Sequence, residues 1–567
     1  MELAEIADSV IETDVLIVGG GVAGCIAAVK ASEHGADVTM VDKAAIRRSG
    51  GAASGMDHIA TIPNAGITIK DIVTQVCDDG VYPPIFAKKG LTNPNLFYTA
   101  WKDTKKRLAE MEEWGVTVRW DDGEYYWIPS GRTGGTTTIR FHGLQFKPQL
   151  AAAVRNKGVR VLERTMGVDL LRQGEKVVGA VALNIRNNDF TVIKAKATIV
   201  ATGMVQRIFN PEDGAPWKNK MMYHWCPMGA GDAHAMAYRA GGKLVNMEFS
   251  SWFSRMIDDK TLMFGSLTDG DGMSTRIVNA NGDVVCENAF MSLEKYVEEE
   301  EKGRTPLYFD VPSNPENHQI KREIATADER PVSLKYIKDR GWNYRTHRWE
   351  LHGTKPLALT KNLAAIVTDE TFKTTVEGLF GAGDCVQAGG AVTGSIGTGF
   401  ITAENAAKYA GQAEAPVIDE DQVRHLKERI FAPYKVKDGA EPMEFETKIR
   451  MITERYTGIF RSAGKLREGL SRLADVRKDW LHRIAATTPH ELMRAMDCHN
   501  LMDLAEVHFK SALMREDTRA SFYRKDFPER NPAWDKKVIF AYGKEGETVT
   551  EKGEFPEMKP AYAEESN

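Results

Sequence analysis

The sequence predicts an α/β fold in which a Rossmann-like domain is followed by a helical domain. Three observations support this prediction. The apolar run Asp14–Val18 enters a glycine-rich turn, as a buried parallel strand does, and a helix and a second strand follow it. Two later segments, Lys196–Gly203 and Val376–Cys385, are again strands that end in small-residue turns. Apolar residues recur with a 3.6-residue period in 443–476, which is typical of helices that pack on one face.

The first turn has the spacing of a dinucleotide-binding fingerprint. Gly19, Gly21 and Gly24 form G-x-G-x-x-G, and the acid Asp42 ends the second strand, 18 residues after Gly24. The first glycine allows the tight turn, the second lets the backbone approach a pyrophosphate, and the third lets the helix pack on the strand. The helix N-terminus then faces the phosphates. We expect further contacts with the cofactor from Val22, Ala23, Lys43, Ser49, Gly50 and Gly51.

Two later segments complete the predicted cofactor site. We expect Asp384 to bind ribityl hydroxyls, and we expect the N-terminus of a helix at Gly394–Gly411 to stabilise negative charge on a reduced flavin ring. Together with the first turn, these segments indicate FAD. Because the chain has one dinucleotide fingerprint, we do not expect direct use of NAD(P)H. The remaining predicted contacts are Val168, Ala201, Thr202, Gly203, Gly397 and Thr398.

Composition excludes several classes of partner. The 567 residues are 42% hydrophobic and 27% charged, with a net charge of −5, so nucleic acid is not an expected partner. No apolar run reaches the roughly 20 residues that a membrane span needs, and we expect a cytoplasmic protein. None of the six cysteines has metal-ligand spacing, so we expect no metal and no iron–sulfur cluster in the chain itself.

A resemblance to a known family rests on two longer segments, Gly231–Phe249 and Ala512–Arg530. With the cofactor motifs, they resemble the flavoprotein subunits of fumarate reductase, succinate dehydrogenase, L-aspartate oxidase and adenylylsulfate reductase, although Ala520 and Phe522 replace a usual Gly and His. The resemblance implies an α/β, Rossmann-like FAD-binding domain with an inserted α+β capping domain and a C-terminal helical domain. The implied limits are 1–240 and 355–412 for the FAD-binding domain, 241–354 for the capping domain, 413–535 for the helical domain and 536–567 for a polar, irregular tail that is either disordered or wraps a partner.

The substrate residues of the family are missing from this sequence. Fumarate and succinate enzymes hold a dicarboxylate with two histidines and an arginine, and a second arginine moves the proton. Aligned here, the histidine positions carry Phe253 and Thr360, and the clamping position carries Ser395. The segment Glu287–Tyr296, where the second arginine belongs, contains no arginine. We therefore do not expect fumarate, succinate or aspartate chemistry.

The adenylylsulfate reductase alpha branch is the most similar. Three segments resemble that branch most closely: Val41–Gly55, Phe141–Val154 and Ser395–Lys408. Two positions depart from it, because Leu144 replaces an acid and Met222 replaces an aromatic residue near the flavin. The resemblance thus implies a divergent member of the family with an undetermined substrate.

Three residues are candidates for the substrate side, each with a plainer alternative. Arg255 would be an anion clamp or proton donor, or else a surface ion pair. His142 would donate to substrate or flavin, or else be a buried histidine with its hydrogen bonds satisfied. Lys361 would contact substrate or a flavin carbonyl, or else be a solvent-exposed strand lysine.

The sequence favours an FAD-dependent oxidoreductase that exchanges two electrons with its substrate at flavin N5. The resemblance implies a small ferredoxin-like iron–sulfur subunit as the electron partner. Two alternatives remain: an adenylylsulfate reductase alpha subunit, and a non-catalytic FAD module that relays or bifurcates electrons in a larger complex. The FAD is expected to be non-covalent, because Arg48–Ser49 is followed by Gly50 and Gly51, where covalent members carry a histidine.

Overall fold

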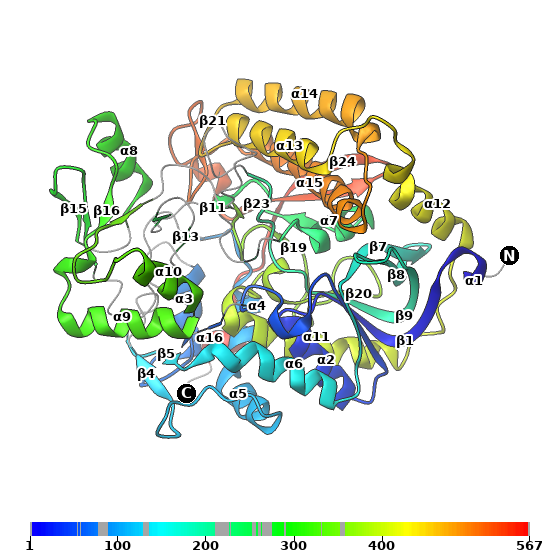
Figure 1. Ribbon diagram of the computed structural model, residues 1–567, viewed down its shortest axis with the longest axis horizontal. Coiled ribbons are helices and arrows are strands. Elements are labelled where there is room, and N and C mark those ends of the chain that lie inside the picture. Colours follow the sequence, from blue (N-terminus) through cyan, green and yellow to red (C-terminus); the bar gives the residue numbers. More distant parts are fainter. Residues whose placement is uncertain are drawn as a thin grey trace.

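Figure 1 shows the chain as a computed structural model. No helix in the part of the chain that this structure describes is long and apolar enough to cross a membrane. The structure describes residues 3–53, 55–56, 58–77, 89–128, 135–209, 226, 228–251, 257–258, 262–263, 275–287, 291–329, 331–351 and 358–564.

A seven-stranded sheet forms the centre of the fold and confirms the α/β prediction. Its strand order is β6-β2-β1-β9-β8-β7, and β20 also pairs with β9. β1, β2, β6, β9 and β20 pair in parallel, whereas β7 and β8 form an antiparallel extension of the sheet. The bounds are β1 Ser9–Val18, β2 Val38–Asp42, β6 Arg160–Glu163, β7 Thr165–Gln173, β8 Lys176–Asn184, β9 Phe190–Val200 and β20 Leu379–Gly381.

Helices α2, α6 and α11 lie together on one side of this sheet (Figure 1). α11 begins three residues before the predicted start, so Gly394 lies inside it. A Cβ at Gly394 would lie 2.2 Å from the carbonyl oxygen of Ala388, so the glycine allows the helix to lie close against the preceding loop. The bounds are α2 Val22–Glu33, α4 Pro94–Trp101, α5 Thr104–Glu113, α6 Phe146–Asn156 and α11 Ala391–Ala410.

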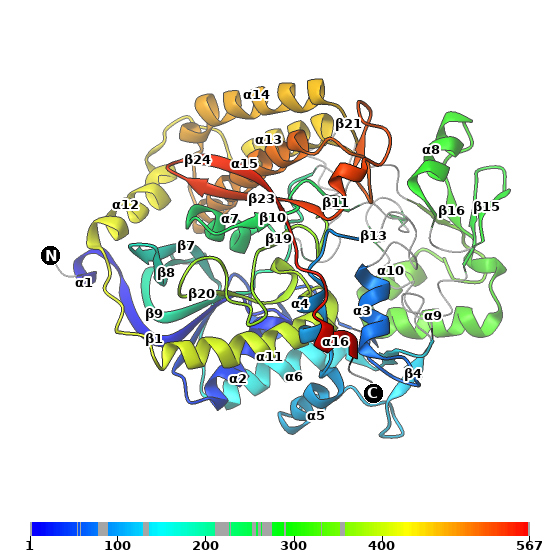
Figure 2. The same cartoon turned by 180° about the vertical axis from the view of Figure 1, so that it is seen from behind.

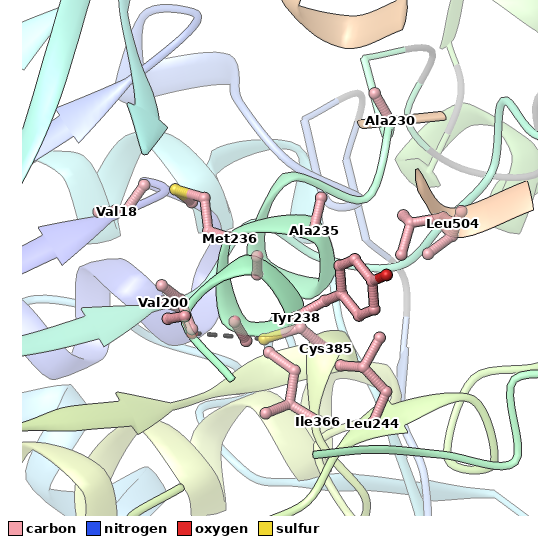
Figure 3. Close-up of a cluster of buried hydrophobic side chains, with 14 of the residues drawn as sticks. Val18, Val200, Ala230, Ala235, Met236, Tyr238, Leu244, Ile366, Cys385 and Leu504 are labelled. Atoms are coloured by element: carbon pink, nitrogen blue, oxygen red, sulfur yellow. Dashed lines mark hydrogen bonds between the residues drawn. The ribbon is translucent and has the colours of Figure 1, made fainter. Parts of the chain in front are cut away.

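Helix α7 links the other side of the sheet to the C-terminal helices. Figure 3 shows the hydrophobic cluster around it, where Met236 of α7 points toward Val18 at the end of β1, and Leu504 of α15 lies near Ala235. This packing places α15 close to the carboxyl ends of the strands. The bounds are α7 Asp232–Arg239, α12 Glu420–Phe431, α13 Pro442–Tyr456, α14 Ala463–Trp480 and α15 Pro489–Met514.

A smaller α+β unit projects from the body of the molecule (green in Figure 1). It has a hydrophobic core of its own, in which Phe309 and Trp349 are fully buried. The main chain of α9 accepts a hydrogen bond from Arg140 Nη2 at Lys321 O, 3.2 Å, so the unit contacts the segment that precedes α6. The bounds are β14 Ile277–Val278, β15 Val284–Cys286, α8 Leu293–Glu301, β16 Tyr308–Phe309, α9 Glu316–Glu329, α10 Pro331–Asp339 and β17 Trp349–Glu350.

The C-terminal residues form a regular hairpin, so the prediction of an irregular tail was wrong for 537–554. β23 Lys537–Lys544 and β24 Glu547–Glu554 join β10 Leu244–Val245 and β19 Ala365–Ile366 in one sheet. The two-residue turn between them has positive φ at both residues, 52° and 84°. The sequence did not predict these strands because β24 is the edge strand of the sheet, and its solvent-facing positions carry charged side chains instead of apolar ones.

After the hairpin the chain runs as a strap along the molecule (red in Figure 2). Tyr562 stacks on Tyr98 of α4 with ring centroids 4.2 Å apart, and its hydroxyl donates to Glu370 at 2.7 Å. Lys559 forms an ion pair with the same carboxylate at 2.6 Å. The tail therefore packs against its own chain.

Candidate functional site

A cavity of about 440 Å³ lies where the parallel strands β1, β2 and β9 end. This is the edge of an open α/β sheet where ligands bind. Most of the predicted site residues line it, although they come from distant parts of the sequence. They are Gly19, Gly21, Val22, Ala23, Asp42, Lys43, Ser49, Gly50, Gly51, Ala201, Thr202, Gly203, Lys361 and Asp384.

The glycines of the first turn differ in what surrounds them. Gly19 adopts a φ of 109°, and a Cβ there would lie 2.6 Å from Ala201 O. A Cβ at Gly24 would lie 1.9 Å from Gly19 O, so Gly24 allows α2 to approach the strand and does not line the cavity. A Cβ at Gly21 would meet no protein atom within 4 Å, which leaves the bare backbone open to a ligand. This cradle fits a pyrophosphate at the N-terminus of α2.

The carboxylate of Asp42 is fixed by the backbone of the same turn. Its Oδ2 accepts from Gly20 N at 2.6 Å and its Oδ1 accepts from Ala44 N at 2.7 Å. Ser49 Oγ donates to Gly20 O at 2.9 Å and holds the neighbouring loop against the turn. Asp42 thus faces the cavity in one orientation, which suits an acceptor for ribose hydroxyls.

Asp384, Lys361 and the first turns of α11 form another part of the cavity lining. Ala391, Val392 and Ser395 of this helix line the cavity, so its positive N-terminal end faces the ligand space. Burial raises the pKa of the Asp384 carboxyl, and the nearby charge of Lys361 opposes this effect. Lys361 and the N-terminus of α11 stabilise negative charge on this part of the lining, and Asp384 supplies some of that charge, since its Oδ1 accepts from Ala391 N at 3.3 Å.

Two predicted contacts act from behind this wall. Thr398 Oγ1 accepts from Gly383 N at 2.9 Å and so holds the loop that carries Asp384. A Cβ at Gly397 would lie 1.9 Å from Ala100 O, so this glycine allows α11 to pack on α4. Neither residue lines the cavity, and each supports a residue or helix that does.

Two of the remaining candidates, His142 and Val168, do not line the cavity. His142 is absent from the cavity lining: its Nδ1 lies 2.8 Å from Asp328 Oδ1, and its ring stacks on Trp120 with centroids 4.0 Å apart. Val168 is buried in β7, beside the lining residue Gly167. Arg255 lies outside the described residues, as do Phe253 and Met222.

Sequence reasoning missed Asp232 as a cavity residue. It opens α7 after Gly231, which has a φ of 79°, and its Oδ2 lies 2.7 Å from Lys43 Nζ. Cys226 also lines the cavity, and burial raises the pKa of its thiol. The Gly-Asp pair before an apolar helix was the available signal for Asp232, because a carboxylate in the first helical turn is a common N-terminal residue.

The fold and the cavity define a dinucleotide-binding flavoprotein. A family model described as "FAD binding domain" matches residues 14–396, which is more than half of the chain. A second model, "Fumarate reductase flavoprotein C-term", matches residues 446–561. The chain therefore belongs to the family of FAD-binding flavoproteins that includes fumarate reductase subunits, and it is an FAD-dependent oxidoreductase.

Relatives are similar over almost their whole length. A fumarate reductase (CoM/CoB) subunit of Methanothermobacter marburgensis is 24% identical, over 93% of this chain and 97% of the relative. The adenylylsulfate reductase alpha subunit of Megalodesulfovibrio gigas is 24% identical, over 91% and 90%. The solved adenylylsulfate reductase of Archaeoglobus fulgidus has a TM-score of 0.83 at 24% identity, over 97% and 96%, which shows a common fold.

Proposed function

We propose that the chain is a catalytic flavoprotein subunit that passes electrons between a small substrate, with an anion as the favoured class, and an iron–sulfur partner subunit. The observation that carries this proposal is the cavity wall formed by Lys361, Asp384 and the N-terminus of α11. When bound, FAD exchanges two electrons with an organic substrate and passes them on singly.

The residues of this chain hold the cofactor and set the charge around it. The glycine turn receives the pyrophosphate, and Asp42 receives the ribose. Lys361 and the N-terminal turn of α11, which line the same cavity, would stabilise negative charge there. The wall offers cationic and dipolar stabilisation, which favours an anionic substrate over a neutral apolar one.

The substrate differs from a C4 dicarboxylate in this proposal. Ser395 lines the cavity where the family places its clamping arginine, and Thr360 replaces a substrate histidine beside Lys361. A hydroxyl cannot supply the charge-assisted, bidentate hydrogen bonds of a guanidinium. A dicarboxylate bound here would therefore lack its main stabilising interactions with the protein.

The partner is proposed from two observations. No pair of cysteines in the sequence has Cys-x-x-Cys spacing, so the chain offers no such motif for a cluster of its own. The fumarate reductase and adenylylsulfate reductase relatives are each named as one subunit of a larger enzyme. We expect a cluster-bearing subunit to accept the electrons one at a time.

The second candidate is the alpha subunit of an adenylylsulfate reductase, favoured by the segments Val41–Gly55 and Phe141–Val154. The two candidates separate in one assay of the FAD-loaded chain. Under anaerobic conditions, bleaching of the flavin absorbance is followed with sulfite plus AMP, and its return is followed with adenylylsulfate and with a panel of other small anions. Turnover with adenylylsulfate selects the second candidate. A flavin absorbance that responds to none of the anions, in a chain that rapidly exchanges electrons between two cluster-bearing proteins, would contradict both candidate functions. The chain would then be an electron-transfer module.

A further inference from the structure

A buried charge network leads from the cofactor cavity into the C-terminal helices. Lys43 Nζ lies 2.7 Å from Asp232 Oδ2 and 2.7 Å from Asp497 Oδ1. Lys43 and Asp232 line the cavity, whereas Asp497 belongs to α15 and is fully buried behind them. The ammonium group of Lys43 therefore joins the cavity wall to a helix that does not touch the ligand space at this point.

The network continues on the far side of Asp497. Its Oδ2 accepts from Arg207 Nη1 at 2.6 Å, and Arg207 Nε donates to Glu446 Oε1 of α13 at 3.0 Å. The side chains of Asp497, Arg207 and Glu446 are all fully buried. Arg494 of α15 also pairs with Glu446, with 2.9 Å between Nη2 and Oε2. Cations and carboxylates thus alternate from the cavity through α15 to α13.

The two carboxylates beside Lys43 are not equivalent. Burial raises the pKa of Asp232, whose other oxygen accepts a hydrogen bond from Asn500 at 2.8 Å. Burial acts in the same direction on Asp497, but Lys43 and Arg207 overcome it and hold the pKa of Asp497 below its usual value. Asp497 therefore lies between two cations, Lys43 and Arg207, that stabilise its negative charge.

A buried charge is stable only when its partners stay in place. If Asp497 loses its charge, Lys43 and Arg207 are left as two cations on either side of a neutral group, and the contact that holds Lys43 to α15 is weakened while its contact with Asp232 remains. If α15 shifts, the same change occurs. In either case the position of the Lys43 ammonium depends on the packing of α15, whose Asp497 lies 454 residues further along the chain.

We propose that Asp497 is a positioning residue of the cofactor site: it holds Lys43 at the cavity wall, so that FAD binding and the packing of α13 and α15 stabilise each other. This inference rests on FAD as the ligand of the cavity. It does not depend on the substrate or the partner proposed above, since its tests measure FAD binding and helix protection alone.

The first test compares two substitutions at Asp497 in the full chain. Asp497→Asn keeps the shape and removes the charge, whereas Asp497→Glu keeps the charge and changes the shape. A positioning role through charge predicts that the FAD dissociation constant rises at least tenfold in Asp497→Asn and much less in Asp497→Glu. A role in packing alone predicts the reverse order, which would overturn the proposal.

The controls use Lys43 and a second acid of α15. In Lys43→Met, removing the charge of Asp497 as well should weaken FAD binding no further, because the two residues act through one contact; additive losses would contradict the proposal. Glu506→Gln is the matched control, because Glu506 lies on the same helix and pairs with Arg477 and Lys510. Its FAD affinity should equal that of the unaltered chain.

A second measurement needs no substitution and so does not depend on the folding of a variant. Hydrogen–deuterium exchange of the unaltered chain is compared with and without FAD. The proposal predicts slower exchange in α13 and α15 when FAD is bound, in addition to slower exchange around the cavity. Protection confined to the segments that line the cavity would overturn it.

Discussion

The glycine turn allows a prediction that separates cofactor binding from folding. Gly21 precedes α2 with a φ of −66°, which alanine adopts without strain, and its added methyl group would meet no protein atom within 4 Å. Gly21→Ala should therefore change the free energy of unfolding of the FAD-free protein by no more than about 0.5 kcal/mol. The methyl group instead occupies the space where a pyrophosphate approaches the backbone. We expect FAD affinity to fall at least about tenfold, or ~1.4 kcal/mol.

Gly24→Ala is the matched change with the opposite expected pattern. Its methyl group would lie 1.9 Å from the backbone oxygen of Gly19, so α2 must move away from β1. Overpacking of this kind costs about 1–3 kcal/mol. The FAD-free protein itself should become less stable, and FAD affinity should fall as a consequence.

The assay measures two quantities for each variant. Urea unfolding of FAD-free protein, followed by far-UV circular dichroism, gives stability, and quenching of flavin fluorescence on titration gives affinity. The reasoning fails if Gly21→Ala binds FAD like the unaltered chain. It also fails if Gly24→Ala leaves the urea midpoint unchanged, since the helix would then have room that the structure denies it.

Three further predictions concern the flavin, the substrate and acid stability. Acid precipitation should release the FAD as free yellow cofactor, because Gly50 and Gly51 stand where covalent members have a histidine; flavin fluorescence that stays with the denatured chain in a gel would refute this. Fumarate reduction, succinate oxidation and aspartate oxidation should be negligible, because Thr360 and Ser395 lack cationic hydrogen bonds worth about 1.5–3 kcal/mol each; robust fumarate reduction by the pure protein would overturn the alignment. The hydrogen bonds from Arg524 lower the pKa of Asp526 to about 2, so the stabilisation is present above the unfolded pKa of about 3.9 and is lost as the pH falls toward 2. Asp526→Asn should flatten the fall in stability between those pH values, and an unchanged acid profile would exclude this ion pair as a cause.

The cofactor half of the site could be predicted from sequence because its determinants are local. The tight turn, the helix start and the acid at the end of β2 all lie within 19–42, and each requires a particular residue type at a fixed spacing. The strands that follow this segment were found for the same reason. The N-terminus of α11 was placed only approximately, since the glycine that marked its predicted start serves packing inside the helix.

The parts that sequence did not predict depend on long-range contacts. Nothing local to Lys43 indicates Asp497 as its partner, because the pairing exists only once α15 packs beside α7. His142 illustrates the same limit: the sequence suggested a contact with substrate or flavin, but its ring stacks on Trp120 and its Nδ1 lies 2.8 Å from Asp328 Oδ1 on α9. The hairpin of β23 and β24 was missed because an edge strand carries the polar residues of a loop.

The contrast between main-chain groups set by local sequence and side chains set by long-range contacts has a functional consequence. The cavity presents main-chain groups, among them those of the glycine turn and of the N-terminal turn of α11, which a side-chain substitution elsewhere in the lining does not remove. In the function proposed above, substrate choice depends on side chains, and two of these, Ser395 and Lys361, line the same cavity. One exchange at such a position alters charge and reach without disturbing the cradle. A chain can therefore keep the fold and the cofactor turn of its family while it changes its substrate, and this chain is 24% identical both to a fumarate reductase subunit and to an adenylylsulfate reductase alpha subunit.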